Sequence, residues 1–174
     1  MRAALVVGLV LALAAPSASS AVHAFRFTAA SDVHQGKSIA KRFTCDGNDV
    51  APKLVWRGVP KRAKELALVL EDPDVPGGTF THWLTYGLSP LTNEWGRSGW
   101  TAYAVPRLGR NDFGKIGYGG PCPPAGQTHH YVFRLLALDA KLKLRGGADR
   151  PAFNRAVDHH VLAQARLVAT YARH

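Results

Sequence analysis

Residues 65–76 read ELALVLEDPDVP, which predicts a buried strand followed by a rigid turn. An apolar run bounded by turn residues is typical of a strand buried in a sheet. Pro73 and Pro76 fix φ and cannot donate to a hydrogen-bond ladder, so they end the strand. We expect Asp72 to sit on a rigid turn after the strand rather than paired within the sheet, a placement that suits a binding site.

Other segments alternate or run apolar between turn signals in the same way. The sequence predicts strands over residues 25–28, 53–56, 65–70, 83–88, 131–138 and 162–171. In the last of these, the alternate residues from Ala163 to Tyr171 share one face, as in a sheet that is wet on one side. A helix is predicted over residues 150–160, with Asp149 as its N-cap and Pro151 in its first turn. The Gly- and Pro-rich residues 93–126 predict mainly loops.

The chain has 174 residues, 47% of them hydrophobic, which is enough apolar material for one compact domain. Met1 and Arg2 precede an apolar run over residues 3–15, and small residues follow up to Ala24. This order predicts a signal peptide over residues 1–24 and a domain over residues 25–174. The alternative is a retained anchor, although a spanning helix needs roughly 20 apolar residues. Export predicts a secreted or periplasmic protein with at most peripheral membrane contact.

The two cysteines, Cys45 and Cys122, are candidates for one disulfide, because the compartments outside the cytoplasm are oxidising. Two separate buried thiols are the alternative. On the chain-entropy model, a bond that closes so long a loop stabilises the fold by about 4 kcal/mol.

The formal net charge is +10, a balance that favours acidic partners such as phosphates, anionic lipid surfaces or acidic proteins. Basic residues cluster within residues 37–42, 57–64 and 141–145, without interleaved aromatic residues or a nucleic-acid motif. We interpret them as solvated loop charges and do not expect a nucleic acid as partner.

Two segments are dense in polar and turn-forming residues, and each adjoins a predicted strand. The first carries Asp72 and His82, and the second carries His129 and Tyr131. Since alternate residues of a strand share a face, His129 and Tyr131 point to one side and His130 to the other. In a pocket for a small anion, the two imidazoles and the phenol donate to anionic oxygens, and the carboxylate orients an imidazole and raises its affinity for a proton.

Gly119 and Gly120 precede the second segment and allow close approach of the backbone. Their amides, when free, add an anion-binding concavity to the same pocket.

Purely structural roles remain open for these residues. Asp72 could cap a turn, His82 and His129 could be hydrogen-bonded side chains of the core, and Tyr131 could simply pack as an aromatic residue of the sheet. A hydrolase needs a nucleophile, yet neither segment contains a serine, and the Gly-x-Ser-x-Gly motif is absent. A metal site has suitable ligand types but no short paired spacing, so we expect neither a metal nor another cofactor.

Four blocks of sequence occur in order along the chain: Cys45-Asp46-Gly47 with Pro52, Leu54 and Trp56; Asp72-Pro73-Asp74-Val75-Pro76 with His82-Trp83; Asn111-Asp112-Phe113-Gly114 with Gly117-Tyr118-Gly119-Gly120-Pro121; and Pro123-Pro124 with His129-His130-Tyr131. Together they resemble the signature of the phosphatidylethanolamine-binding protein family, in its bacterial YbhB/YbcL-like branch, also called Raf-kinase-inhibitor-like.

The resemblance implies a mostly β fold, with a central antiparallel sheet, a second small sheet and a few peripheral helices. It also implies a pocket that accepts phosphate, acetate or a phospholipid headgroup, lined by Asp72, His82, His129 and Tyr131, with Pro124 at its rim. We therefore expect a ligand-binding protein that is not an enzyme. The alternative is an inhibitor that acts on a protease, a kinase or another enzyme through surface loops, and hydrolysis is a distant third.

Overall fold

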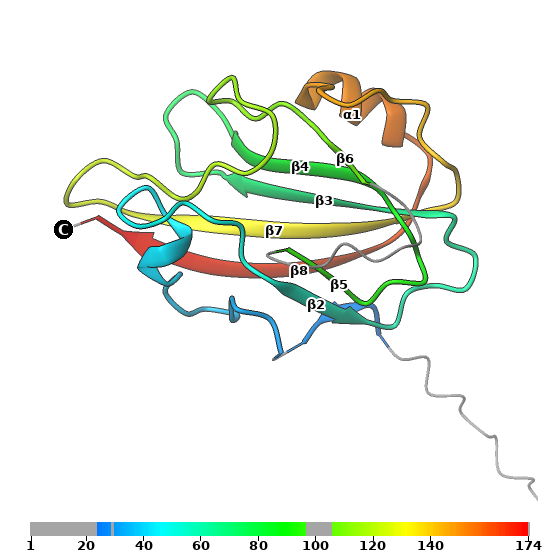
Figure 1. Cartoon of the computed structure of the whole chain (residues 1–174), viewed down its shortest axis with the longest axis horizontal. Helices are drawn as coiled ribbons and strands as arrows, with labels where there is room; N and C mark the ends of the chain where they lie inside the picture. The colour runs from blue at the N-terminus through cyan, green and yellow to red at the C-terminus, as the bar shows by residue number, and fades with distance from the viewer. Residues whose placement is uncertain (1–23, 29, 97–105, 174) are drawn as a thin grey trace, which may run out of the picture.

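The computed structural model describes residues 24–28, 30–96 and 106–173, which form two antiparallel sheets and one α-helix. The larger sheet contains, from edge to edge, β6 (Arg107–Leu108), β4 (Phe80–Leu88), β3 (Glu65–Asp72), β7 (Thr128–Leu138) and β8 (Val161–Ala172). The smaller sheet contains β1 (Arg26–Phe27), β2 (Leu54–Arg57) and β5 (Glu94–Trp95). The helices are the short 3-10 helix η1 (Lys41–Phe43) and α1 (Arg150–Val157). Figure 1 shows β4, β3, β7 and β8 side by side in that order. The predicted fold class is confirmed.

The central strand β3 is buried along its whole length, because both faces of the larger sheet are covered. Leu66, Leu68 and Leu70 point into a core shared with the smaller sheet. Ala67 and Val69 point to the other face, into a core that includes Phe153 of α1. Burial on both faces explains why residues 65–70 read as a continuous apolar run rather than as an alternating one.

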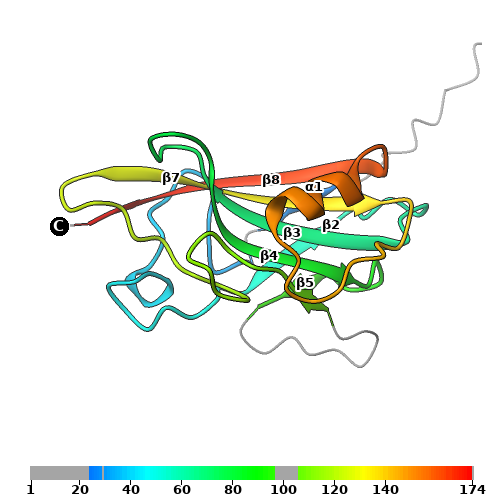
Figure 2. The same ribbon diagram turned by 90° about the horizontal axis from the view of Figure 1, so that it is seen from above.

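Strand β8 has one buried face and one wetter face, as its alternating sequence predicted. Ala165, Leu167, Ala169 and Tyr171 are buried, and Arg166 between them is exposed. The end of β8 lies beside the start of β7, where Thr128 pairs with Ala172, as Figure 2 also shows. One end of the larger sheet therefore gathers the last residues of β3 and β8 and the first residues of β7.

The helix α1 begins where the sequence predicted. The Asp149 side chain accepts a hydrogen bond from the Ala152 amide at 2.8 Å, and Pro151 occupies the first turn. The helix ends at Val157, three residues earlier than predicted, since His159 adopts a φ of 62°, which a right-handed helix does not accommodate.

Several strands are longer than predicted. β4 begins at Phe80 rather than at residue 83, and β7 begins at Thr128 rather than at residue 131. The expectation that Asp72 lies outside the ladder is wrong: it is the last residue of β3 and pairs with Phe80. The proline at 73 ends the strand one residue after the carboxylate.

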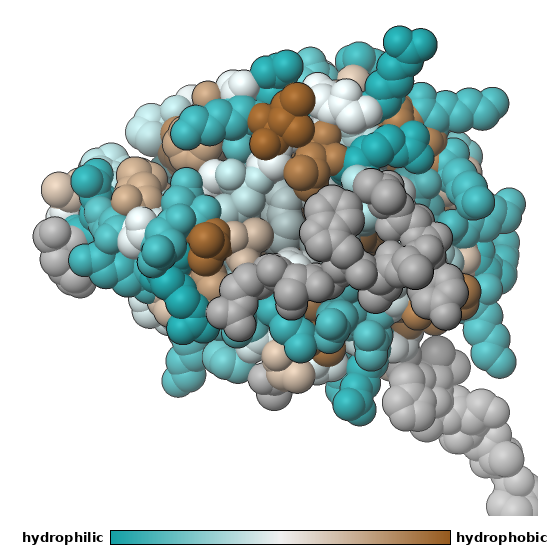
Figure 3. All heavy atoms as spheres, in the orientation of Figure 1, coloured by the Kyte–Doolittle hydropathy of each residue, from teal (hydrophilic) through white to brown (hydrophobic). Residues whose placement is uncertain are grey.

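Residues 93–126 are mainly loops as predicted, with β5 and β6 as short strands inside them, and residues 97–105 lie outside the described part. The predicted signal peptide, apart from Ala24, also lies outside the described residues. Within those residues, no helix is long and apolar enough to cross a membrane. The face seen in Figure 3 is mainly hydrophilic, with hydrophobic residues in small separate patches.

Candidate functional site

A pocket of about 210 Å³ opens at the end of the larger sheet where β3 ends and β7 begins. The polar residues of its lining are Asp72, His82 and His129. The residues around them are mainly apolar: Val75, Pro76, Phe80, Phe113, Cys122, Pro123 and Pro124. The structure therefore brings together four of the predicted residues, three polar ones at the base and the exposed Pro124 at the rim. The sequence reasoning missed most of the apolar wall.

Asp72 is the central polar group of the pocket and is 2% exposed. Its Oδ2 lies 2.7 Å from Nδ1 of His129 and 4.0 Å from Nε2 of His82. Its Oδ1 accepts a hydrogen bond from the Asp74 amide at 2.9 Å. The turn-capping role that the sequence left open is therefore real, and it coexists with a carboxylate oxygen that faces both imidazoles.

A β-bulge in β4 directs His82 into the pocket. Leu70 pairs with Trp83 and Glu71 pairs with Thr81, so His82 has no partner residue on β3. An extra residue of this kind re-aims the side chains around it. Strict alternation along β4 would put His82 and Trp83 on opposite faces, whereas the bulge lets His82 reach Asp72.

The protonation state of His82 follows from its partners. Its Nδ1 lies 2.8 Å from the Gly119 carbonyl oxygen and 3.1 Å from that of Gly120. Carbonyl oxygens only accept hydrogen bonds, so Nδ1 carries the proton. Burial lowers the pKa of His82 below its ordinary value, and the Gly119 carbonyl and the Asp72 carboxylate oppose this only in part. The neutral ring therefore presents Nε2 to the pocket as an acceptor.

His129 and Tyr131 lie on one face of β7, and His130 lies on the other, as the alternation predicted. His129 and Tyr131 are buried, whereas His130 is exposed and pairs with Asp74 at 2.8 Å. The Nε2 atom of His129 lies 3.2 Å from Oε1 of Gln127. The carboxylate thus orients His129 from one side and a side-chain amide from the other.

Tyr131 lies behind the pocket instead of lining it. Its ring packs edge-on against His82 with 5.3 Å between centroids. Its hydroxyl is buried without a hydrogen-bond partner among the described residues. Burial, reinforced by the nearby Asp72 carboxylate, raises the pKa of Tyr131. This tyrosine supports the His82 ring, and its hydroxyl does not reach the pocket surface.

Gly119 and Gly120 act through their carbonyls, contrary to the expectation that their amides are free. The Gly119 amide donates to the His82 carbonyl at 2.9 Å, and the Gly120 amide donates to Asp49 Oδ1 at 2.6 Å. A Cβ atom at Gly120 would lie 2.4 Å from the carbonyl oxygen of Phe43, so only glycine fits there. These contacts place the two glycines in the cradle of His82 and not on the ligand side.

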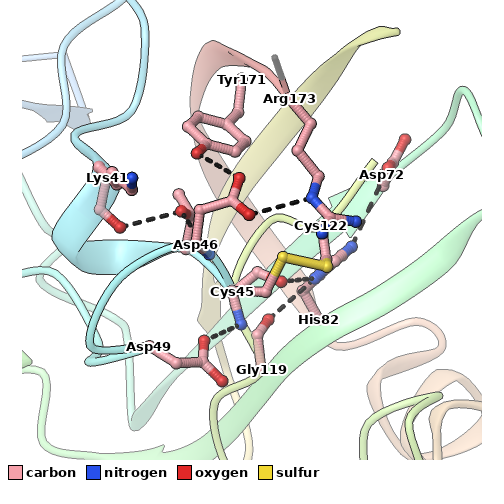
Figure 4. Close-up of a disulfide and its surroundings, with 12 residues drawn as sticks. Lys41, Cys45, Asp46, Asp49, Asp72, His82, Gly119, Cys122, Tyr171 and Arg173 are labelled. Atoms are coloured by element: carbon pink, nitrogen blue, oxygen red, sulfur yellow. Dashed lines mark hydrogen bonds and ion pairs between the residues drawn. A yellow bond between two sulfur atoms is a disulfide. The ribbon is translucent and has the colours of Figure 1, made fainter. Parts of the chain in front are cut away.

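The predicted disulfide between Cys45 and Cys122 is present, with Cα atoms 5.4 Å apart and 77 residues of separation. Figure 4 shows it between Asp49, Gly119 and His82. Beside it, the Cys45 amide donates to the Pro121 carbonyl at 3.1 Å, and Cys122 itself forms part of the pocket wall. The disulfide fixes the loop whose carbonyls hold His82.

The pocket combines three polar groups with an apolar wall, a composition typical of small-molecule sites. Its lining residues, all of them in the described part of the chain, include no Ser, Thr or Lys, and their one cysteine is bonded in the disulfide. No cluster of His, Cys, Asp and Glu among residues 24–28, 30–96 and 106–173 has a metal-binding arrangement. The polar groups of this set can donate and accept hydrogen bonds.

Two packed sheets with this pocket at one end define a small β protein of the ligand-binding kind. A family model described as phosphatidylethanolamine-binding protein matches residues 29–172. The chain therefore belongs to the phosphatidylethanolamine-binding protein family, as the sequence blocks predicted. Proteins of this family are in general binding proteins of phospholipid headgroups or anions.

Known relatives agree with this assignment. The UPF0098 protein of Methanothermobacter thermautotrophicus is 43% identical over 138 residues, which cover 78% of this chain and 91% of the relative. The putative lipoprotein LppC of Mycobacterium tuberculosis is 42% identical over 139 residues, covering 78% of this chain and 67% of its own.

Two solved structures share the fold. A putative phosphatidylethanolamine-binding protein homologue from Chlamydia trachomatis is 36% identical with a TM-score of 0.77, covering 87% of this chain and 99% of its own. Escherichia coli YbcL, described as a member of the mammalian family, is 28% identical with a TM-score of 0.78, covering 86% and 99%.

Proposed function

We propose that the protein binds a small phosphate-like anion, free or as a phospholipid headgroup, together with a proton, and does not turn it over. The observation that carries the proposal is the set of three buried polar groups, Asp72, His82 and His129, which converge on one pocket with an apolar wall. A buried carboxylate with two imidazoles within 4.0 Å is a site where a proton and an anion can be held together.

The hydrogen bonds to the backbone determine which anions suit the pocket. Neutral His82 offers only an acceptor at Nε2, and the Asp72 carboxylate also accepts. At these two groups an anion without a hydrogen would meet only acceptors. Either His82 takes up a proton and donates to the anion, or the anion brings its own hydrogen.

Phosphate meets this requirement near neutral pH, because its second pKa is about 6 in monoesters and a monoprotonated form is available. Sulfate is fully ionised at that pH and brings no hydrogen. We therefore expect phosphate and phosphoethanolamine to bind, with an affinity that rises as the pH falls, and sulfate to bind far more weakly.

The apolar wall strengthens these contacts. Val75, Phe80 and Phe113 surround the polar base, and electrostatic interactions gain strength where water is excluded. The Phe113 ring also packs against His82, with centroids 5.3 Å apart. The wall favours the neutral imidazole of His82 in the free protein and excludes water from it once the ligand is bound.

Two neighbouring histidines provide a matched test. His129→Gln removes a buried pocket group, and His130→Gln removes an exposed imidazole one residue away on the other face of β7. In calorimetric titrations with phosphate, we expect His129→Gln to weaken binding at least about tenfold, the effect of losing a charge-assisted hydrogen bond. His130→Gln should bind like the wild type. Equal affinity of all three proteins would place the anion elsewhere.

The setting of this function outside the cytoplasm is also part of the proposal. The disulfide and the similarity to a protein named as a lipoprotein support an extracytoplasmic location. Cleavage of residues 1–24 and secretion or a periplasmic location stay predictions, which N-terminal sequencing of the mature protein tests. Inhibition of an enzyme through the surface loops also stays a prediction.

A further inference from the structure

A second polar cavity lies on the opposite face of the larger sheet, beneath α1. It has a volume of about 420 Å³ and is lined entirely by polar and charged side chains: Glu71, Thr79, Thr81, Arg134, Arg150 and Asn154. Glu71 directly precedes Asp72 on β3, so the two carboxylates point to opposite faces of the same strand. The sheet therefore separates this cavity from the pocket around His82.

Two arginines converge on the Glu71 carboxylate. Arg134 of β7 approaches it with Nε at 2.8 Å and with Nη2 at 3.0 Å, and Nη2 of Arg150 contacts it directly. Nε of Arg150 donates to the side chain of Asn154 at 2.8 Å. Each guanidinium carries five N–H donors, so the Nη1 group of each arginine is left without a partner among the described residues. The cavity therefore has unused donors on permanently charged groups.

A hydroxyl on the cavity wall supplies a further donor. Thr81 is 1% exposed, lines the cavity and forms no side-chain hydrogen bond within the described residues. Its hydroxyl can therefore donate to a molecule in the cavity. The bulge at His82 is the reason that Thr81 faces this cavity, since it pairs with Glu71 across β3.

We propose that this cavity is a second anion site, which binds the phosphate group of a small polar phosphate compound. The charged residues that line it are two arginines and one glutamate, which leaves an excess of one positive charge. Guanidinium groups match the geometry of phosphate oxygens, and the Thr81 hydroxyl donates to a further oxygen. The volume exceeds that of the first pocket and its lining is polar, so it accommodates a hydrophilic substituent such as glycerol.

Two further carboxylates lie near the cavity and reduce its positive potential without lining it. Asp149 caps α1 through the Ala152 amide, and Asp112 accepts a hydrogen bond from the Thr81 amide at 2.6 Å. Both side chains are engaged with backbone donors, and neither lines the cavity.

The hydroxyl gives the sharpest test, with a matched control. In Thr81→Val the cavity hydroxyl is replaced by a methyl group, and in Thr85→Val the same change is made at a buried hydroxyl that lies outside the cavity. The mature protein is labelled with ¹⁵N and titrated with inorganic phosphate. The Thr81 and Asn154 amide signals report the second site, and the Gly119 and Gly120 signals report the first.

We expect both sets of signals to shift in the wild type and to saturate independently. Thr81→Val should weaken phosphate binding at the second site about tenfold, the effect of losing one hydrogen bond to a charged group. Its thermal stability should be unchanged. Thr85→Val should leave both sets unchanged. Absence of phosphate-dependent shifts at Thr81 and Asn154 in the wild type would overturn the proposal, as would equal binding by Thr81→Val and the wild type.

The arginines provide a second pair of variants. Arg150→Gln removes a cavity donor, whereas Arg155→Gln makes the same charge change at an exposed position of the same helix. Only Arg150→Gln should weaken phosphate binding at the second site. Equal effects of the two variants would indicate a diffuse effect of charge and would also overturn the proposal of a second site. Tighter binding of glycerol 3-phosphate than of phosphate would identify an ester as the natural ligand, and equal binding would identify free phosphate.

Discussion

Two adjacent carboxylates of β3, Glu71 and Asp72, are buried on opposite faces of the same sheet and have different kinds of partner. Asp72 faces two imidazoles, whose charge depends on pH. Glu71 faces two guanidinium groups, which keep their charge at every pH relevant to a protein. One strand thus carries a carboxylate paired with imidazoles on one face and a permanently charged cluster on the other.

Removal of the disulfide should have the largest effect and should act on one face only. Replacement of Cys45 and Cys122 by serine opens a long loop and is expected to lower the free energy of unfolding by about 4 kcal/mol. The freed loop holds His82 through two carbonyls, so phosphate binding at the first pocket should be lost. The cavity around Glu71 has no contact with the disulfide and should keep its phosphate-dependent shifts. Chemical denaturation and site-resolved titration of the double variant measure both effects.

The two carboxylates should also differ in their contribution to stability. Glu71→Gln leaves two arginines beside a neutral amide, and loss of one partner from a largely buried ion pair is expected to cost about 2 to 3 kcal/mol. Asp72→Asn should cost about 1 kcal/mol, because the amide oxygen can still accept the hydrogen bond from His129. Urea denaturation of both variants at neutral pH gives the comparison. A larger loss in Asp72→Asn would reverse our assignment of the permanent and the proton-linked charge.

The N-cap of α1 connects helix stability to the Glu71 side alone. Asp149→Ala removes the hydrogen bond to the Ala152 amide and is expected to cost about 1 kcal/mol. Because Arg150 is the first residue of the helix, fraying there should weaken the ion pair with Glu71 and leave the first pocket intact. Hydrogen exchange at the start of α1 measures the fraying, and phosphate titration of both sites measures its effect on binding. Weaker binding at the first pocket in this variant would argue against the independence of the two faces.

The smallest expected effect is a pH dependence of stability that comes from His82. Burial lowers its pKa in the folded protein, whereas the unfolded chain titrates near 6.5. Between these two values the unfolded chain binds more protons, so the free energy of unfolding falls as the pH falls through about 6.5. His82→Asn keeps a donor for the Gly119 carbonyl but removes the titration. The wild type should therefore lose more stability on acidification than this variant, and parallel curves would contradict the neutral state of His82.

Much of the first pocket could be predicted from sequence, because strand alternation fixes the direction of side chains. Two-residue spacing placed His129 and Tyr131 on one face, and the apolar run up to residue 70 brought Asp72 to the end of the sheet. Sequence alone could not show that Tyr131 lies behind His82, since depth within a face depends on packing with other elements.

The bulge at His82 was hidden because it is a property of the pairing between β3 and β4 and not of either strand. It places His82 in one site and Thr81 in the other. The cluster of Glu71, Arg134 and Arg150 was missed for a similar reason. These residues come from two strands and a helix that are distant in the sequence, and only an isolated arginine within the apolar β7 could have signalled it.

We propose that the first pocket binds its anion together with a proton, and proton uptake on binding measures this directly. We would titrate the mature protein with phosphate by calorimetry near pH 8, where the dianion of a group with a pKa of about 6 to 7 dominates, in two buffers of different ionisation enthalpy. We predict an uptake of close to one proton in wild type and no comparable binding of sulfate. Loss of the uptake in His82→Asn would place the proton on the imidazole, and its persistence would place it on the anion. Identical enthalpies in the two buffers, with sulfate bound as tightly as phosphate, would contradict the proposal.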